Sequence, residues 1–234
     1  MKGGKILRIE LILNLFGREI FLPDTIVNTW IIVVLLSIFA FYVNRQVKKA
    51  RVEDKPSGFL NFIELLVEGV ESLVESTMGK DKLGFAPYIG TLALYLVVAN
   101  LFGLLGFTPP TSDYSVPFTL ALITFVLTQY YGIKSKGAGS YFKGFFEPFW
   151  PMFPLNVIGE LANPISLSFR LFGNILSGVI IMGLLYTALA QLSIIVAPVI
   201  TPVFHAYFDV FAGVIQTFIF IMLTMVFISM AMDD

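Results

Sequence analysis

Five long apolar stretches, separated by short polar segments, run along the 234-residue chain. Three of them have the length of a single transmembrane helix, which needs about 20 apolar residues: 26–44, 86–106 and 116–133. Pro109 and Pro110 lie between the second and third stretches, where they prevent the helix from continuing. We therefore predict three membrane-spanning helices, the second and third of which form a hairpin.

The last two apolar stretches, residues 155–190 and 194–231, are much longer than a bilayer crossing requires. A short break lies near residues 191–193, and Pro198 and Pro202 follow at the start of the second stretch. Overlong apolar helices fit a bilayer when they tilt. These residues are thus predicted to form a steeply tilted helical hairpin.

Residues 59–76 follow a different pattern. Apolar side chains recur at helical spacing, and four glutamates occupy another face: Glu64, Glu68, Glu71 and Glu75. This segment is predicted to be an amphipathic helix that is too charged to cross the membrane. The N-terminal residues 1–25 combine basic, acidic and apolar positions and lack a small-residue cleavage site, so an interfacial segment is expected there.

The predicted fold is an all-α integral membrane protein of one domain, with about five to six membrane helices. Its parts are an N-terminal interfacial segment, a first transmembrane helix, a cytoplasmic amphipathic segment, a transmembrane hairpin, a cytoplasmic loop and the tilted hairpin: 1–25, 26–44, 45–85, 86–133, 134–154 and 155–234. Lysine and arginine are frequent in 45–55 and 134–143 and absent from 107–115. Basic loops stay in the cytoplasm, which predicts an N-terminus outside and a C-terminus inside.

The composition excludes several classes of function. Hydrophobic residues make up 57% of the chain and charged residues 13%, about half of what soluble domains carry. The net charge of −1 leaves no basic face for nucleic acid. The absence of cysteine excludes disulfides and thiolate metal sites. No GxxxxGK phosphate loop occurs, so no nucleotide site and no bound cofactor are expected.

Arg170 is the one fixed positive charge between Glu147 and Asp233. A charge at bilayer depth costs at least roughly 2.5–3.5 kcal/mol, which suggests a function. On a helix, a polar stripe falls within an arc of about 80°: Asn163, Ser166, Arg170, Asn174 and Ser177. Glu160 lies beside it. The stripe predicts an interface with a polar partner, although an internal ion pair of Arg170 with Glu160 or Asp209 is an alternative.

The last helix carries a second polar group. His205, Asp209 and Gln216 share a face of a regular helix, at offsets of four and seven residues. An imidazole and a carboxylate one turn apart can exchange protons through water, which favours an ion path over a simple polar contact. One histidine without cysteine disfavours zinc. Asn100 and Gln129, in the second and third spans, are predicted to hydrogen-bond between helices.

Three segments resemble subunit a of F-type ATP synthases: ELANPISLSFRLFGNILSG at 160–178, GVIQTFIFIMLTMVFISMA at 213–231 and GFTPPTSD at 106–113. The arginine followed by LFGN is the specific part of the first segment. The resemblance extends in order from the first span to the C-terminus.

The resemblance implies a mechanism for Arg170. In this family the arginine faces a ring of c subunits and favours the ionised form of each ring carboxylate by charge attraction. It also separates two half-channels that carry H⁺ or Na⁺. The implied partners are the c-ring, the b subunits of the peripheral stalk, membrane lipid and, indirectly, the catalytic head. The implied location is the bacterial plasma membrane.

The resemblance also implies roles for the other polar residues. Asn174 and Gln216 match positions that line the ion path, and His205 and Asp209 match the outer half-channel. Many members carry an acid nine residues after the arginine, where this chain has Val179; Asp209, with His205 one turn earlier, is expected to replace it. Glu160 is expected to line a half-channel or to cap the start of its helix.

Two other functions are compatible with the apolar pattern. A stand-alone ion transporter or channel would show paired halves or broken helices around a central site, and no such symmetry is visible. A structural assembly protein would use Arg170 only for a salt bridge.

Overall fold

The described segments that are long and apolar enough to cross a membrane are all helical. The computed structural model describes residues 11–15, 18–50, 57–192 and 196–233. Within them, five helical segments are long and apolar enough to cross a membrane: Asp24–Val47, Lys80–Leu105, Ser115–Lys136, Trp150–Leu189 and Pro198–Met232. The predicted all-α integral membrane fold with about five membrane helices is confirmed.

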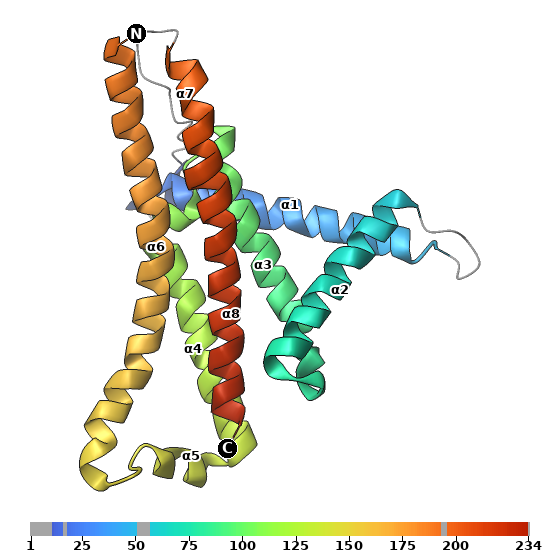
Figure 1. Ribbon diagram of the computed structural model, residues 1–234, viewed down its shortest axis with the longest axis vertical. Helices are drawn as coiled ribbons and strands as arrows, with labels where there is room; N and C mark the ends of the chain where they lie inside the picture. Colours follow the sequence, from blue (N-terminus) through green and yellow to red (C-terminus); the bar gives the residue numbers. More distant parts are fainter. Residues whose placement is uncertain (1–10, 16–17, 51–56, 193–195, 234) are drawn as a thin grey trace.

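A long helical hairpin dominates the molecule. Helix α6 (Phe153–Leu192) lies beside the continuous run of α7 (Val196–His205), η5 (Ala206–Phe211) and α8 (Ala212–Met232), as Figure 1 shows. Helix α6 has 40 residues and so is about 60 Å long, twice the roughly 30 Å thickness of a bilayer core. Helix α1 (Asp24–Val47) runs across this pair in Figure 1. The two directions cannot both be perpendicular to the membrane, and the tilt of the long hairpin stays a prediction.

The other helices begin and end close to the predicted positions. Helix α2 (Gly58–Met78) covers the predicted amphipathic segment, and the Ser57 hydroxyl caps it by accepting from the Leu60 backbone amide. Helix α3 (Ala86–Leu101) continues through the short turns η2 (Phe102–Leu105) and η3 (Pro110–Ser112) into α4 (Ser115–Lys136). The first helix of this hairpin ends at Gly106, whose left-handed backbone (φ 82°) reverses the chain before Pro109 is reached.

The core lies where α3, α4, α6 and α8 meet. Its fully buried side chains interlock across these four helices: Ile89, Leu96, Ala121, Leu167, Leu171, Phe220, Met225 and Ile228. Asn100 is a buried polar side chain in the same region, and it donates to the Gly213 carbonyl (3.0 Å) and the Thr217 hydroxyl (3.1 Å). The Thr111 hydroxyl donates to its carbonyl oxygen at 2.9 Å. The predicted interhelical role of Asn100 is confirmed.

The start of α1 is tied to the turn between α3 and α4. The Thr108 hydroxyl donates to Asp24 (2.7 Å), the Thr25 hydroxyl to Asp113 (3.0 Å), and the Asn28 amide to the Thr108 carbonyl (2.8 Å). Burial raises the pKa of Asp113, but hydrogen bonds from Ser115 and Thr25 outweigh it, so the pKa lies below its usual value. The hydrogen bonds thus hold the start of α1 against the turn that joins α3 to α4.

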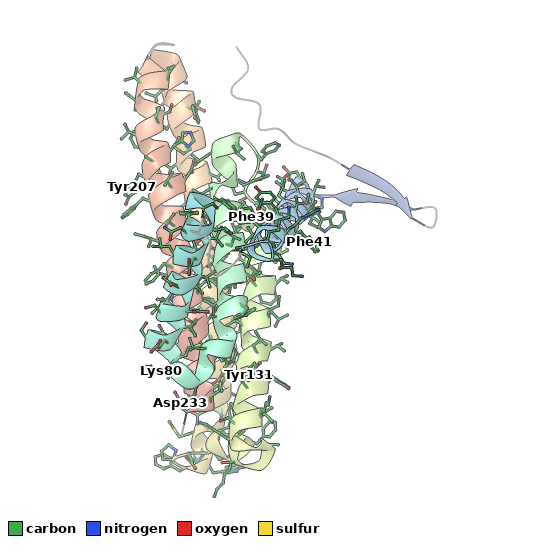
Figure 2. All side chains as sticks on the ribbon, turned by 90° about the vertical axis from the view of Figure 1, so that its right-hand side faces the viewer. Phe39, Phe41, Lys80, Tyr131, Tyr207 and Asp233 are labelled. Atoms are coloured by element: carbon green, nitrogen blue, oxygen red, sulfur yellow. The ribbon has the colours of Figure 1, made fainter. Side chains whose placement is uncertain are left out.

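The C-terminus is tied to the opposite ends of α3 and α4. Lys82 forms an ion pair with Asp233 and donates to the Ser229 hydroxyl at 3.1 Å. The Ser135 hydroxyl donates to the Met232 carbonyl at 2.9 Å. Hydrogen bonds from Lys82 and Ser229 hold the pKa of Asp233 below its usual value. Figure 2 shows Lys80 and Asp233 at the same end of the molecule.

Three segments contain structure that the sequence pattern did not predict. The described part of the N-terminal segment forms two antiparallel strands, β1 (Leu11–Leu15) and β2 (Arg18–Leu22), with Leu11 opposite Leu22. Its position at the membrane surface stays a prediction, and residues 1–10 lie outside the described residues. The loop 134–154 contains α5 (Ala138–Gly144) and η4 (Trp150–Met152).

The third unexpected feature is η5, a π-helical turn inside the last long stretch. The prediction of one regular helix over 194–231 is wrong at Ala206–Phe211. Hydrogen bonds there run from residue i to i+5, which inserts an extra residue into the helical register. Residues on either side of η5 consequently do not keep the face relation of a regular α-helix.

Candidate functional site

Arg170 lies on the exposed side of α6. The buried positions of this helix recur every three or four residues and face the core: Pro164, Leu167, Leu171, Ile175, Gly178 and Met182. Arg170 falls between them, with Ser166 and Ser177 also exposed and Asn163 and Asn174 half-buried. The predicted polar stripe therefore borders the core and opens onto the outer face of the hairpin.

Within the described residues, Arg170 makes neither an ion pair nor a side-chain hydrogen bond. The two carboxylates proposed as internal partners bind other residues: Glu160 accepts from Gln129, and Asp209 pairs with His205. The described residues therefore contain no ion pair between Arg170 and Glu160 or Asp209. A guanidinium stays charged at any physiological pH, so Arg170 presents an uncompensated positive charge.

Glu160 lines a cavity at one end of the hairpin. The cavity has a volume of about 660 Å³ and lies among α4, α5, α6 and α8, with Asn163 and Lys136 also in its wall. The Gln129 amide donates to Glu160 at 3.2 Å, and the Tyr141 hydroxyl donates to Gln129 at 2.8 Å. The expected interhelical bond of Gln129 is thus confirmed.

The Glu160 carboxylate also affects its neighbour Tyr141. Burial and the nearby Glu160 charge raise the pKa of Tyr141, although its bond to Gln129 lowers it in part, so the phenol stays a donor at neutral pH.

Helix α6 begins at Phe153, seven residues before Glu160. A cap at the helix start is therefore wrong for Glu160, because capping requires a residue in the first turn.

His205 and Asp209 lie near the opposite end of the hairpin. The His205 Nδ1 atom bonds to the Asp209 carboxylate, and its Nε2 atom bonds to the Tyr186 hydroxyl at 2.6 Å. The sequence placed His205 and Asp209 together but missed Tyr186. Finding it would have required the register between α6 and α7, and no local motif encodes that register.

Asn174 and Gln216 occupy the middle of the hairpin. The Asn174 amide donates to the Ala212 carbonyl at 3.5 Å, which places these two residues at one level. One helical turn further along each helix brings Arg170 and Gln216 to a common level. Gln216 is 5% exposed, and its amide nitrogen has no hydrogen-bond partner among the described residues. A buried unpaired donor costs roughly 1–3 kcal/mol, so Gln216 is a polar position that the packing of this hairpin leaves unsatisfied.

The shared face predicted for His205, Asp209 and Gln216 needs correction. His205 and Asp209 do contact each other, but η5 separates them from Gln216. The His205 ring links Asp209 to Tyr186 by hydrogen bonds. Gln216, in contrast, is buried. The predicted residues therefore form three groups along the hairpin: Glu160 at one end, Arg170 with Asn174 and Gln216 in the middle, and His205 with Asp209 toward the other end.

This fold and site define a class of protein: a multi-pass helical membrane protein with ionisable groups spaced along one long hairpin, as ion translocation requires. Residues 26–229 match the family described as ATP synthase A chain. The chain therefore belongs to the subunit a family of ATP synthases, the non-catalytic, ion-translocating component of the membrane sector.

Individual relatives agree with this assignment over most of their length. The ATP synthase subunit a of Geobacter sulfurreducens is 36% identical over 216 residues, which cover 90% of this chain and 88% of the relative. The subunit from Staphylococcus epidermidis is 36% identical and covers 94% and 95%. The sodium ion specific subunit a of Propionigenium modestum is 36% identical and covers 90% and 74%. This chain thus associates with an ATP synthase complex.

Proposed function

We propose that this chain is the stationary subunit that presents Arg170 to a rotating ring of c subunits, each with a carboxylate in the membrane. The exposed, unpaired guanidinium of Arg170 carries this proposal. A ring carboxylate arriving opposite it would be favoured in its ionised form. The ring site must therefore release its ion before it passes Arg170.

The two ionisable groups on either side of Arg170 support two offset half-channels. Glu160 lies ten residues before Arg170 on α6, about 15 Å away along the axis. The His205–Asp209 pair lies on the other side of the Asn174–Ala212 contact. We assign the cavity at Glu160 to the cytoplasmic half-channel and the His205–Asp209 pair to the outer one, with Asn174 and Gln216 between them. The transported ion is H⁺ or Na⁺, and no bound cofactor is required.

The helix contacts support the expected orientation. The start of α1 is bonded to the turn at 107–115. The C-terminal residues are bonded to Lys82, just before α3, and to Ser135, at the end of α4, and both of these adjoin the basic loops. Because basic loops stay in the cytoplasm, we place the start of α1 outside and the C-terminus inside. The proposed membrane is the bacterial plasma membrane.

The remaining partners follow from the rotary mechanism. The c-ring covers the Arg170 face, the b subunits of the peripheral stalk hold this chain against rotation, and the catalytic head is reached only through these subunits. Lipid covers other apolar surfaces.

Replacing Arg170 with alanine tests the central claim. In membrane vesicles with the complete synthase, Arg170→Ala is expected to abolish ATP-driven ion uptake while the subunits still copurify, because the ring carboxylates lose their opposing charge. Lys143→Ala, which removes an exposed cation from α5, is the matched control and should pump normally. Loss of assembly in Arg170→Ala, with normal pumping by the residual complexes, would favour a purely structural arginine.

A further inference from the structure

Three side chains near the α7 end of the hairpin form a continuous hydrogen-bonded chain. Tyr186 comes from α6, His205 ends α7, and Asp209 lies in η5. The Tyr186 hydroxyl is 2.6 Å from Nε2 of His205, and Nδ1 of the same ring bonds to the Asp209 carboxylate. The imidazole therefore bridges a phenol and a carboxylate through its two opposite nitrogens.

Exposure falls along this chain. Tyr186 is 45% exposed as a residue, whereas the side chains of His205 and Asp209 are 27% and 19% exposed. The order from phenol to carboxylate therefore leads from the surface inward. Beyond Asp209, the Asn174–Ala212 contact lies three residues further along the chain, about 4.5 Å along the axis. The inner end of the cluster thus points along the hairpin toward the level of Arg170.

We propose that Tyr186 and His205 relay protons between water at the outer membrane face and Asp209. The inference rests on the proposed function and adds Tyr186 to the ion path. A neutral imidazole has one nitrogen that donates and one that accepts. With the proton on Nδ1, Nε2 accepts from Tyr186, and Nδ1 donates to the Asp209 carboxylate.

One transfer through the cluster balances as follows. A hydronium ion at the outer face gives a proton to the Tyr186 oxygen and leaves as water. That oxygen passes its own proton to Nε2, and Nδ1 passes its proton to Asp209. At the ring one N–H bond forms, at Nε2, and one breaks, at Nδ1, and the phenol and imidazole end neutral. Asp209 becomes a neutral carboxylic acid, ready to release its proton toward the c-ring. The first tautomer is restored when Nε2 loses its proton to water and Nδ1 gains a proton from water, with no net change of charge.

The same geometry disfavours a sodium ion at this place. Hard cations require several oxygen ligands that converge on one point. The Tyr186 and Asp209 oxygens lie on opposite nitrogens of the imidazole, so the ring separates them. Among the described residues, no group of three acidic, cysteine or histidine side chains is placed to hold a metal ion. The cluster suits a proton, which moves along hydrogen bonds.

The test compares ATP-driven proton uptake in vesicles with the complete synthase, measured in H₂O and in D₂O. Tyr186→Phe is expected to slow uptake about fivefold, the value of one hydrogen bond, and to raise the H₂O/D₂O rate ratio because proton transfer becomes limiting. Tyr207→Phe is the matched control. Tyr207 is 57% exposed, has no hydrogen bond to the cluster and is labelled in Figure 2.

Two variants of His205 separate relay from structure. His205→Gln keeps a donor and an acceptor but cannot exchange protons, and His205→Ala keeps neither. A relay predicts that both slow uptake about tenfold or more, since a positioned proton-transfer group contributes at least about a hundredfold and water replaces part of it. Uptake by His205→Gln at the normal rate would overturn the relay, as would identical behaviour of Tyr186→Phe and Tyr207→Phe.

Arg170→Ala in the same vesicles separates this inference from the proposed function. If Arg170→Ala stops pumping while the Tyr186 and His205 variants pump normally, the relay fails and the stator role stands. If Arg170→Ala pumps normally, the proposed function fails, and the relay that rests on it fails too.

Discussion

At the residue scale, the acidic, basic and imidazole side chains of the hairpin divide into those with a partner in this chain and one without a partner among the described residues. Glu160, Gln129 and Tyr141 form one chain of bonds, and His205 with Asp209 forms another. Arg170 is left without a partner among the described residues. The sequence identified Arg170 because a lone charge in an apolar helix is visible without any contact. It could not identify Tyr141 or Tyr186 as partners, because these contacts join segments whose register is set by packing.

We expect Asp209 to supply the acidic group that many family members carry at the position of Val179, and this expectation can be tested. Val179 lies five residues after Asn174 on α6, and Asp209 lies three residues before Ala212 on the neighbouring helical run. Both positions are therefore on the same side of the Asn174–Ala212 contact. The two positions are then within about 3 Å along the axis. Asp209→Asn is expected to slow ATP-driven ion uptake by about tenfold or more, because the outer path loses its proton-accepting group.

The double variant Val179→Glu with Asp209→Asn tests whether the two positions are equivalent. Val179 is 37% exposed and has room for a larger side chain. Uptake is expected to recover at least in part relative to Asp209→Asn alone, with Val179→Gln plus Asp209→Asn as the uncharged control. Normal uptake by Asp209→Asn alone would refute the assignment of Asp209 to the path.

At the scale of elements, periodicity predicted the helices and missed the irregularities. The predicted amphipathic segment 59–76 is helix α2, Gly58–Met78, because alternating faces of glutamate and apolar residues specify one buried side. The π turn at Ala206–Phe211 carries no comparable signal. Just after this turn, Gly213 lets α8 approach α3 so closely that an added Cβ would lie 3.2 Å from Asn100 Cβ.

Asn100→Leu is expected to weaken the contact of α3 with α8. The change leaves the Gly213 carbonyl, the Thr217 hydroxyl and the Thr111 hydroxyl without the Asn100 partner. At about 0.6–1.7 kcal/mol for each interhelical bond in a membrane, the free energy of unfolding should fall by about 2–4 kcal/mol. Thermal unfolding of the purified complex in detergent measures this loss as an earlier release of the subunit.

The control for Asn100→Leu is Thr91→Val on the same helix. The Thr91 hydroxyl donates only to the Pro87 carbonyl of its own helix, and the residue is exposed. Its removal should change the release temperature very little. Equal effects of the two variants would mean that the Asn100 bonds add nothing beyond local helix stability.

At the scale of the whole molecule, the crossing of α1 over the long hairpin determines how the protein fits a bilayer. The sequence predicted the tilt because the apolar stretches 155–190 and 194–231 are both too long to stand upright in about 30 Å of hydrocarbon. It could not predict that the Glu160 cavity and the His205–Asp209 pair lie on opposite sides of the Asn174–Ala212 contact, since that separation depends on the antiparallel register of two helices.

The orientation gives the last prediction, and the chain is suited to testing it because it contains no cysteine. Single cysteines at Ser115 and Ala138, both exposed, mark the turn beside the start of α1 and the loop that contains α5. In intact cells, a membrane-impermeant maleimide is expected to label Ser115→Cys and not Ala138→Cys, because the basic loop stays inside. Inverted vesicles should give the reverse pattern. Labelling of Ala138→Cys in intact cells would invert the orientation, and with it the assignment of the Glu160 cavity to the cytoplasmic half-channel.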